Sequence, residues 1–153
     1  MALTIQDGRP GDLDEVRALL TGVGLSTDGV VEHIADFLVA RENGRLVATA
    51  ALEDHGTAGL LRSVAVAPDR QRWGLARYLT NASIERARGR SLAAVYLLTR
   101  DAQRYFERHG FRPIDRNEVR PAVRQSTQFQ EESCASATAM VLDLIEHPGP
   151  KED

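Results

Sequence analysis

The sequence predicts a single α/β domain, in which helices and strands alternate along the chain. Apolar residues recur at helical spacing from Leu13 to Leu20. The dipeptide Asn43-Gly44 separates two β-rich segments, which is typical of a tight hairpin because both residues accept a positive φ. Ala93 to Thr99 is an uninterrupted apolar run with β-branched and aromatic members, as expected for a buried strand.

Length and composition limit the classes of protein to consider. The chain has 153 residues, of which 42% are hydrophobic, 22 are acidic and 19 are basic. This length suits one hydrophobic core, and the apolar fraction is too high for a disordered chain. The slightly acidic balance argues against nucleic acid as a partner, because phosphate neutralisation requires an excess of Lys and Arg. Lys151 is the only lysine, so almost all positive charge is carried by arginine.

Cys134 is the only cysteine, which excludes an internal disulfide and a multi-cysteine zinc site, and we expect no metal. No apolar run reaches the roughly 20 residues that span a bilayer, and the first residues lack the apolar segment of a signal peptide. We therefore expect a cytoplasmic protein without membrane contact. Residues 1–145 are expected to form the domain, and 146–153, with two prolines, a flexible tail.

Helices and short strands are expected in the first part of the chain. Leu3 to Gln6 reads as a strand before a turn. Asp12 and Glu15 resemble a capping box and predict the start of a helix. A second helix is expected from Ser26 or Thr27. Its apolar face is predicted to consist of Val30, Val31, Ile34 and Phe37.

Strands are predicted on both sides of Asn43-Gly44, over residues 37–41 and 45–52. Another strand is expected from Leu60 to Val66, followed by Pro68, which cannot donate to a sheet ladder. Simple alternation along this strand places four residues on one face: Leu60, Arg62, Val64 and Val66.

The second half continues the alternation of helix and strand. A helix is expected from Gly74 to Gly89, before the buried strand at 93–99. A short helix from Asp101 to His109 is closed by Gly110, which suits the left-handed C-cap position. The remaining elements are predicted as a strand at 111–114, partly helical structure at 117–129 and a last strand at 135–144.

The most informative segment joins the strand ending at Val66 to the helix after Gly74. Its small residues leave the backbone open, so that consecutive N–H groups can point at an anion. The unpaired first turn of the helix and the helix dipole favour the same ligand. Arg70, Arg72 and Arg77 add positive charge, so the segment predicts a phosphate site. A plain strand-to-helix connection with small residues for packing is the alternative.

The pattern Q-x-x-G-x-A spans Gln71 to Ala76 and follows the V-x-P of residues 66–68. Residues 102–111 have the form A-x-x-x-F-x-x-x-G-F and follow the predicted strand at 93–99. The first motif resembles the loop that binds the pyrophosphate of acetyl-coenzyme A in the GNAT acetyltransferases. The second is similar to a helix-and-turn signature of that superfamily, in the expected order along the chain.

This resemblance implies a mixed, twisted sheet that splays between its fourth and fifth strands, with acetyl-coenzyme A as co-substrate in the opening. The pantetheine is expected on the backbone of Val64, Ala65 and Val66. Ala102 and Phe106 are expected to line the thioester end. The pyrophosphate is expected on the loop and first helical turn: Gln71, Arg72, Trp73, Gly74, Leu75, Ala76 and Arg77.

The implied reaction is direct acetyl transfer to a neutral amine, which requires a base, an oxyanion donor and an acid. Glu53, at the end of a predicted strand near the cleft mouth, is the expected base, with a solvated strand-end carboxylate as the alternative. A backbone N–H at Ser63 or Val64 is the expected oxyanion donor. Phe106 stands where many family members have a tyrosine acid, so the proton donor stays open. Tyr105, one residue earlier, is expected to face the core.

Longer segments resemble one branch of the superfamily. Residues 60–66, 96–99, 110–116 and 133–137 together are similar to the ArsN-type arsenic-resistance N-acetyltransferases. The last strand also resembles that of N-acetylglutamate synthases. The ArsN resemblance implies acetylation of the α-amino group of arsinothricin, an arsenic-containing glutamate mimic.

An amino-acid substrate with a second anionic group suits arginine, whose planar guanidinium binds carboxylates bidentately. Arg62, Arg112 and Arg116 are the expected substrate ligands. Arg116, Arg120 and Arg124 would share one face if their segment were a single helix, with a solvated arginine stripe as the alternative.

Two alternative functions fit the same residues. One is acetylation of another amino acid or small amine, and the other is that of a non-catalytic acyl-coenzyme A-binding module. We expect a homodimer, as in many members of the superfamily.

Overall fold

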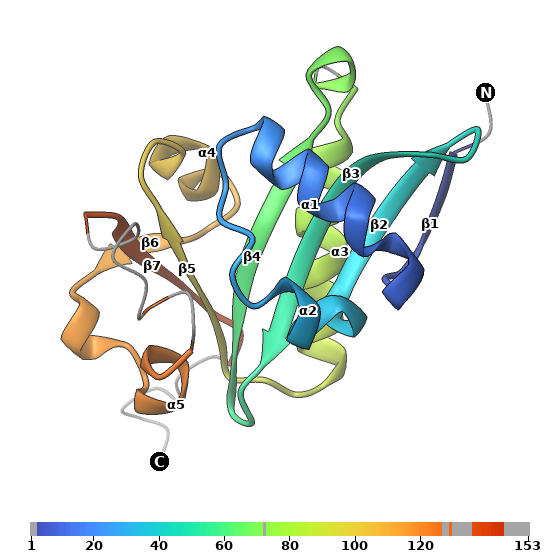
Figure 1. Ribbon diagram of the computed structural model, residues 1–153. Helices are drawn as coiled ribbons and strands as arrows, with labels where there is room; N and C mark the ends of the chain where they lie inside the picture. Colours follow the sequence, from blue (N-terminus) through green and yellow to red (C-terminus); the bar gives the residue numbers. More distant parts are fainter. Residues whose placement is uncertain (1–2, 72, 127–128, 130–135, 146–153) are drawn as a thin grey trace.

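Seven strands form one mixed sheet in the order β1-β2-β3-β4-β5-β7-β6, with helices on both faces (Figure 1). The computed structural model describes residues 3–71, 73–126, 129 and 136–145. The strands are β1 Leu3–Asp7, β2 Phe37–Glu42, β3 Arg45–Asp54, β4 Ala58–Val66, β5 Ala94–Thr99, β6 Arg112–Ile114 and β7 Thr138–Asp143. The α-helices are α1 Leu13–Gly22, α2 Val30–His33, α3 Leu75–Gly89, α4 Gln103–Glu107 and α5 Pro121–Arg124.

Strands β4 and β5 make the one parallel pairing in the described sheet, and they pair over a short stretch. The register joins Ala58 to Ala94, Gly59 to Val95 and Leu60 to Tyr96. Beyond Leu60 the two strands separate, and β5 pairs along its whole length with β7 on its other side. The predicted splay between the fourth and fifth strands is therefore confirmed.

The sheet has an apolar layer on each face. Leu75, Leu79 and Ile84 of α3 pack against β3 and β4 residues such as Leu61. On the other face, Val16 and Leu20 of α1 form a second cluster. In Figure 1, α1 and α2 lie in front of the central strands and α3 lies behind them. Burial of both faces explains why β3 and β4 are apolar almost throughout.

The hairpin between β2 and β3 is confirmed. Asn43 and Gly44 have φ values of 51° and 85°, which is the left-handed conformation that a two-residue turn requires. The two strands are antiparallel, with Glu42 opposite Arg45 beside the turn.

The expected second helix differs from the structure. It begins at Val30 and not at Ser26, because Ser26 Oγ accepts a hydrogen bond from the amide of Asp28 at 3.0 Å and forms a turn. Phe37 belongs to β2, and Val31 is 50% exposed. The predicted apolar face is therefore wrong at these two residues.

The predicted arginine face in the C-terminal part does not form. The segment is a 3₁₀ turn at Arg116–Glu118 followed by the separate helix α5. Arg120 is extended, with ψ of 138°, because it precedes Pro121. Arg116, Arg120 and Arg124 are consequently not on one helix.

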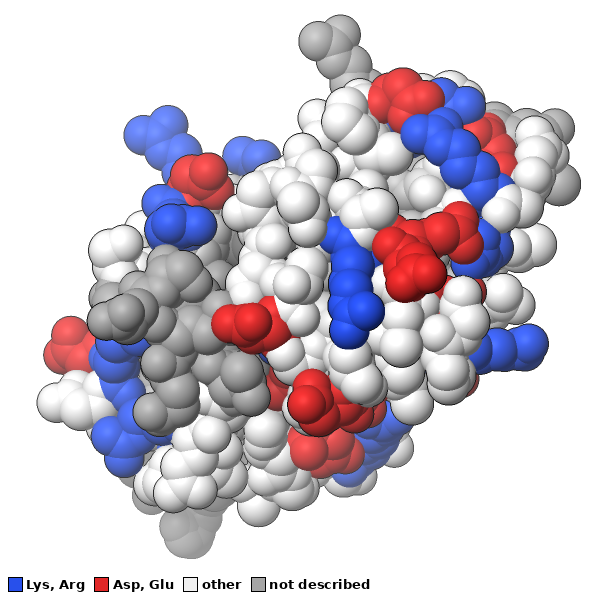
Figure 2. All heavy atoms as spheres, viewed as in Figure 1, with Lys and Arg blue, Asp and Glu red and all other residues white. Residues whose placement is uncertain are grey.

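Acidic and basic side chains are interspersed over the face drawn in Figure 2. Several arginines are paired with acidic residues, including Arg41 with Asp12 at 2.6 Å and with Glu15 at 2.7 Å. In the described part of the chain, no helix has the length and apolar character needed to cross a membrane.

Candidate active site

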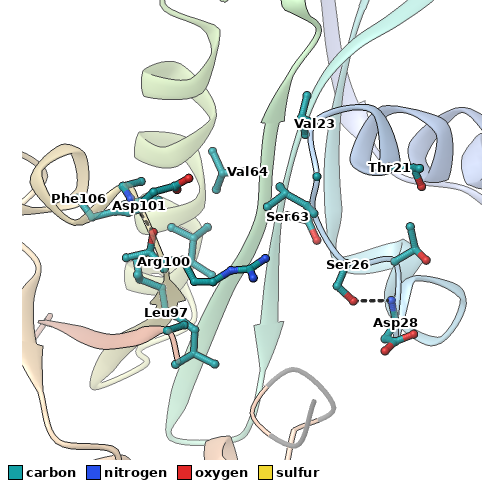
Figure 3. A pocket seen from close by; sticks show the side chains of 18 residues that line it. Thr21, Val23, Ser26, Asp28, Ser63, Val64, Leu97, Arg100, Asp101 and Phe106 are labelled. Atoms are coloured by element: carbon teal, nitrogen blue, oxygen red, sulfur yellow. Dashed lines mark hydrogen bonds between the residues drawn. The ribbon is translucent and has the colours of Figure 1, made fainter. Parts of the chain in front are cut away.

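The opening between β4 and β5 forms a cleft of about 610 Å³. One wall is the connection between α1 and α2, and the other is the segment from Leu97 to Ala102. Ser63 and Val64 of β4 lie between these walls (Figure 3), and Leu61 of the same strand also lines the cleft. The cleft therefore lies where the shortened β4–β5 ladder leaves the β5-facing edge of β4 unpaired.

A β-bulge shapes β4 at the centre of the cleft. Thr49 is opposite Ala65 and Ala51 is opposite Arg62, so one β3 residue faces the pair Ser63 and Val64. Ser63 has a φ of 57°, an uncommon conformation for a residue other than glycine. The Thr49 hydroxyl donates a 2.8 Å hydrogen bond to the Ser63 carbonyl oxygen. The bulge is thus held to β3 by a buried side chain.

This bulge makes the predicted alternation along β4 wrong. Arg62 reaches toward the α2 side, where its Nη2 donates to the Asp28 carbonyl oxygen at 2.6 Å. Val64 and Val66 instead pack in the cluster that contains the α3 side chains. The extra residue changes which face later side chains take, because side-chain direction in a strand has a period of two.

The loop before α3 has the features of an anion site. Gly74, at the N-cap of this 15-residue helix, has a φ of 76°, and a Cβ added there would meet no atom within 4 Å. The following amides of Leu75, Ala76 and Arg77 occupy the first helical turn, where N–H groups have no intrahelical partner. Arg72 lies outside the described residues.

Side chains on both sides of this loop hold it in place. Gln71 Nε2 donates to the Val66 carbonyl oxygen at 3.2 Å. Arg70 bonds to the buried Glu42 at 2.6 Å and lies 4.7 Å from the centre of the Trp73 ring. The charge of Arg70 is therefore compensated by the Glu42 carboxylate, whereas Arg77 is exposed to solvent.

The turn between β5 and α4 forms the other wall. Thr99 Oγ1 accepts a 3.0 Å hydrogen bond from the amide of Ala102, which fixes the start of the turn. Ala102 and Phe106 line the cleft. Tyr105 packs against the core, as expected, and its buried hydroxyl has no hydrogen-bond partner among the described residues.

Glu53 is fully buried and surrounded by basic side chains. Its Oε1 lies 2.9 Å from His55 Nε2, and its Oε2 lies 3.2 Å from Arg62 Nη1 and 3.8 Å from His33 Nε2. Burial alone raises the pKa of Glu53, but the hydrogen bond from His55 and the charges of His33 and Arg62 outweigh it and hold the pKa below its usual range. Glu53 is therefore a buried carboxylate, not the solvated strand-end group of the alternative interpretation.

Glu53 and Arg62 are absent from the described residues that line the cleft. Arg62 nevertheless connects Glu53 to the cleft, because its Nε donates to Ser63 Oγ at 3.2 Å and its Nη2 donates to the Asp28 carbonyl oxygen. Ser63 and Asp28 both line the cleft.

The other expected substrate arginines lie away from the cleft lining. Arg112 is 63% exposed on β6 and pairs with Asp143 at 3.3 Å. Arg116 donates to the Ala137 carbonyl oxygen at 3.0 Å, and Ala137 lines the cleft.

Sequence reasoning missed most polar residues of the cleft. They come from the ends of predicted elements and include Ser26, Asp28, Arg100 and Asp101. A signal was present for the last two, because charged residues directly follow the apolar run of β5. Ligands of open sheets commonly bind at such carboxyl ends of strands. Among the described residues, no group of His, Cys, Asp and Glu is arranged to hold a metal ion.

The splayed mixed sheet with an open strand edge agrees with what the family comparison finds. Residues 33–113 match the acetyltransferase (GNAT) domain family, and this match covers more than half of the chain. The chain belongs to this family.

Known proteins similar to this chain include amino-acid acetyltransferases. Two from Neisseria meningitidis are 26% identical over 126 residues, which is 76% of this chain and 29% of theirs. The chain thus spans less than a third of the length of these curated relatives.

Solved structures share the fold. N-acetylglutamate synthase from Neisseria gonorrhoeae, complexed with coenzyme A and N-acetyl-glutamate, superposes with a TM-score of 0.81 at 21% identity, over 95% of this chain and 36% of that one. Rv2747 from Mycobacterium tuberculosis, in complex with CoA and NLQ, has a TM-score of 0.78 at 22% identity. The superposition covers 93% of this chain and 99% of that one.

Proposed function

We propose that this chain transfers acetyl from acetyl-coenzyme A to the α-amino group of a small amino-acid-like substrate. The cleft beside the free edge of β4 is the observation that carries the proposal. It brings the Ser63 bulge, the β5–α4 turn and a polar loop from the α1–α2 connection around one opening. Relatives named as amino-acid acetyltransferases support the same class of substrate.

The residues present fit acetyl-coenzyme A as co-substrate, which supplies the acetyl thioester. The open backbone at Gly74 and the unpaired amides of the first α3 turn suit a pyrophosphate. Backbone groups of Val64, Ala65 and Val66 lie on the strand edge that β5 leaves open, where an extended chain can pair as a strand does. Ala102 and Phe106 then face the acyl end.

Catalysis requires a donor for the oxyanion and a base for the ammonium proton. We assign the donor to the backbone at Ser63 or Val64, because a bulge takes its extra residue out of the regular ladder. Glu53 remains our candidate base. Since it does not line the cleft, a proton must reach it through His55 or solvent, and Arg62 joins it to Ser63 by hydrogen bonds.

The base role is testable with Glu53→Gln. If Glu53 accepts the proton, turnover at neutral pH falls by about 100- to 10,000-fold, while the Kd of acetyl-coenzyme A stays the same. Unchanged turnover in a folded variant refutes the role.

The particular substrate that we propose is arsinothricin, on the basis of the ArsN-type resemblance. A glutamate mimic agrees with the N-acetyl-glutamate in the complex of the gonococcal relative. Arg112 and Arg116 stay predicted substrate ligands. Arg62 supports the α1–α2 connection through its hydrogen bond to the Asp28 carbonyl oxygen.

The experiment measures thiol release from acetyl-coenzyme A with arsinothricin, L-glutamate and n-butylamine as acceptors. Release with arsinothricin far above that with the other two supports the specific proposal. Release with L-glutamate as the best acceptor supports an amino-acid acetyltransferase of another specificity. Binding of acetyl-coenzyme A without release for any amine would leave a non-catalytic acyl-binding module.

The homodimer and the cytoplasmic location stay predictions. Light scattering on the purified chain gives the mass in solution, and a monomer mass at high concentration contradicts the dimer.

A further inference from the structure

Arg100 is the one arginine among the described residues that line the cleft. It follows β5 directly, and it is exposed. Figure 3 shows its side chain extending from the end of β5 into the opening, in the direction of Ser63 and Ser26. The guanidinium therefore points into the cleft and not along the outer surface.

The Arg100 guanidinium has no hydrogen-bond or ion-pair partner within the described part of the chain. Arg62 is bound to Glu53, and Arg70 is bound to Glu42. These charges are already balanced inside the protein, whereas the charge of Arg100 is available to a ligand.

The anion loop before α3 is a separate feature. None of the described residues 73–77 lines the cleft that contains Arg100. The polar residues opposite Arg100 belong to the α1–α2 connection, where Ser26 and Thr27 carry hydroxyl groups and Asp28 carries a carboxylate. Arg62 holds this connection by its 2.6 Å hydrogen bond to the Asp28 carbonyl oxygen. The wall facing Arg100 is therefore anchored and not a free loop.

We propose that Arg100 binds the carboxylate, or second anionic group, of the amino-acid substrate and so selects amino acids over plain amines. The inference rests on the proposed acetyltransferase function and specifies its substrate subsite. A guanidinium can make two parallel hydrogen bonds to a carboxylate, and these bonds are stronger than neutral ones. Asp28 and Asp101 line the same cleft, and either carboxylate suits the ammonium group of such a substrate.

The test compares Arg100→Gln and Arg100→Lys with the matched control Arg104→Gln. Arg104 is an exposed arginine in α4 that does not line the cleft. We expect Arg100→Gln to raise the KM of the amino-acid acceptor by about 10- to 100-fold, because the variant loses a charge-assisted contact to the acceptor. The KM of acetyl-coenzyme A should stay within about twofold. Arg100→Lys should recover part of the loss, and Arg104→Gln should change neither constant.

Two outcomes overturn the inference. One is an unchanged acceptor KM in folded Arg100→Gln. The other is an equal rise in the KM of acetyl-coenzyme A, which assigns Arg100 to a cofactor phosphate.

A measurement without turnover separates this inference from the proposed function. If no amine is acetylated, the proposed function fails, and calorimetry of L-glutamate with the coenzyme A-loaded protein then tests Arg100 alone. Binding by wild type that is lost in Arg100→Gln supports the subsite, and no binding by wild type overturns it.

Discussion

The guanidinium of Arg62 and the carboxylate of Glu53 lie 3.2 Å apart, and both side chains are 1% exposed. They come from neighbouring strands, β4 and β3. Arg62 also holds Ser63 and the Asp28 carbonyl. This buried pair consequently links the sheet to Ser63 at the centre of the cleft and to the wall formed by the α1–α2 connection.

Glu53→Gln should lower the free energy of unfolding by about 3 to 5 kcal/mol, because a neutral amide leaves the buried Arg62 charge uncompensated. Urea unfolding measures the change. Asp54→Asn is the control, since Asp54 is the adjacent residue and its side chain is 39% exposed. A loss no larger than that of the control would show that the pair does not stabilise the fold.

The same carboxylate predicts a pH dependence of stability. Its folded-state pKa is lowered, so its stabilising effect is present above the unfolded value of about 4.3 and is lost as pH falls through the folded pKa. Between about pH 7 and pH 3.5, wild type should therefore lose more stability than Glu53→Gln. Equal pH dependence of the two proteins contradicts this.

The bulge at Ser63 depends on Thr49. Thr49→Val leaves the Ser63 carbonyl without its 2.8 Å donor and should cost about 1 to 3 kcal/mol of stability. It should also lower kcat, because the backbone around Ser63 is our proposed oxyanion donor.

Thr80→Val is the matched control for this change. Thr80 is fully buried, and its hydroxyl has no hydrogen-bond partner among the described residues. The substitution should leave stability unchanged or raise it, and kcat should not move. A kcat equal to wild type in Thr49→Val would dissociate the bulge from catalysis.

Gly74→Asp should abolish acetyl-coenzyme A binding, because it places a carboxylate at the start of α3 and repels the pyrophosphate. Gly44→Asp is the control, since Gly44 has a φ of 85° and equally open surroundings. Both substitutions cost about 1 to 2 kcal/mol of backbone strain. Calorimetric titration should show wild-type affinity for Gly44→Asp, and retained affinity in Gly74→Asp would refute the loop assignment.

Much of the fold was predictable because local signals agree with the final structure. The turn at Asn43-Gly44, the apolar run of β5 and the glycine before α3 each predict their element. The face of Arg62 was not predictable, because a bulge at Ser63 leaves no mark in the alternation of residue types.

The site was predictable where a contiguous motif forms it, as for Ala102 and Phe106 in the cleft. Burial of Glu53 depends on His33, His55 and Arg62 arriving from other elements, and single-sequence patterns do not contain such long-range contacts. Arg100 was missed because an exposed arginine after a strand ordinarily reads as a solvated residue.

Mass spectrometry of the reaction product tests acetyl transfer to an amino-acid-like amine most directly. Wild type is incubated with isotope-labelled acetyl-coenzyme A and arsinothricin or L-glutamate, with Gly74→Asp as the cofactor-binding control. Wild type should add one labelled acetyl group to the α-amino nitrogen, and Gly74→Asp should add none. Wild type that binds the cofactor but yields no labelled product with any amine would contradict the proposed acetyl transfer.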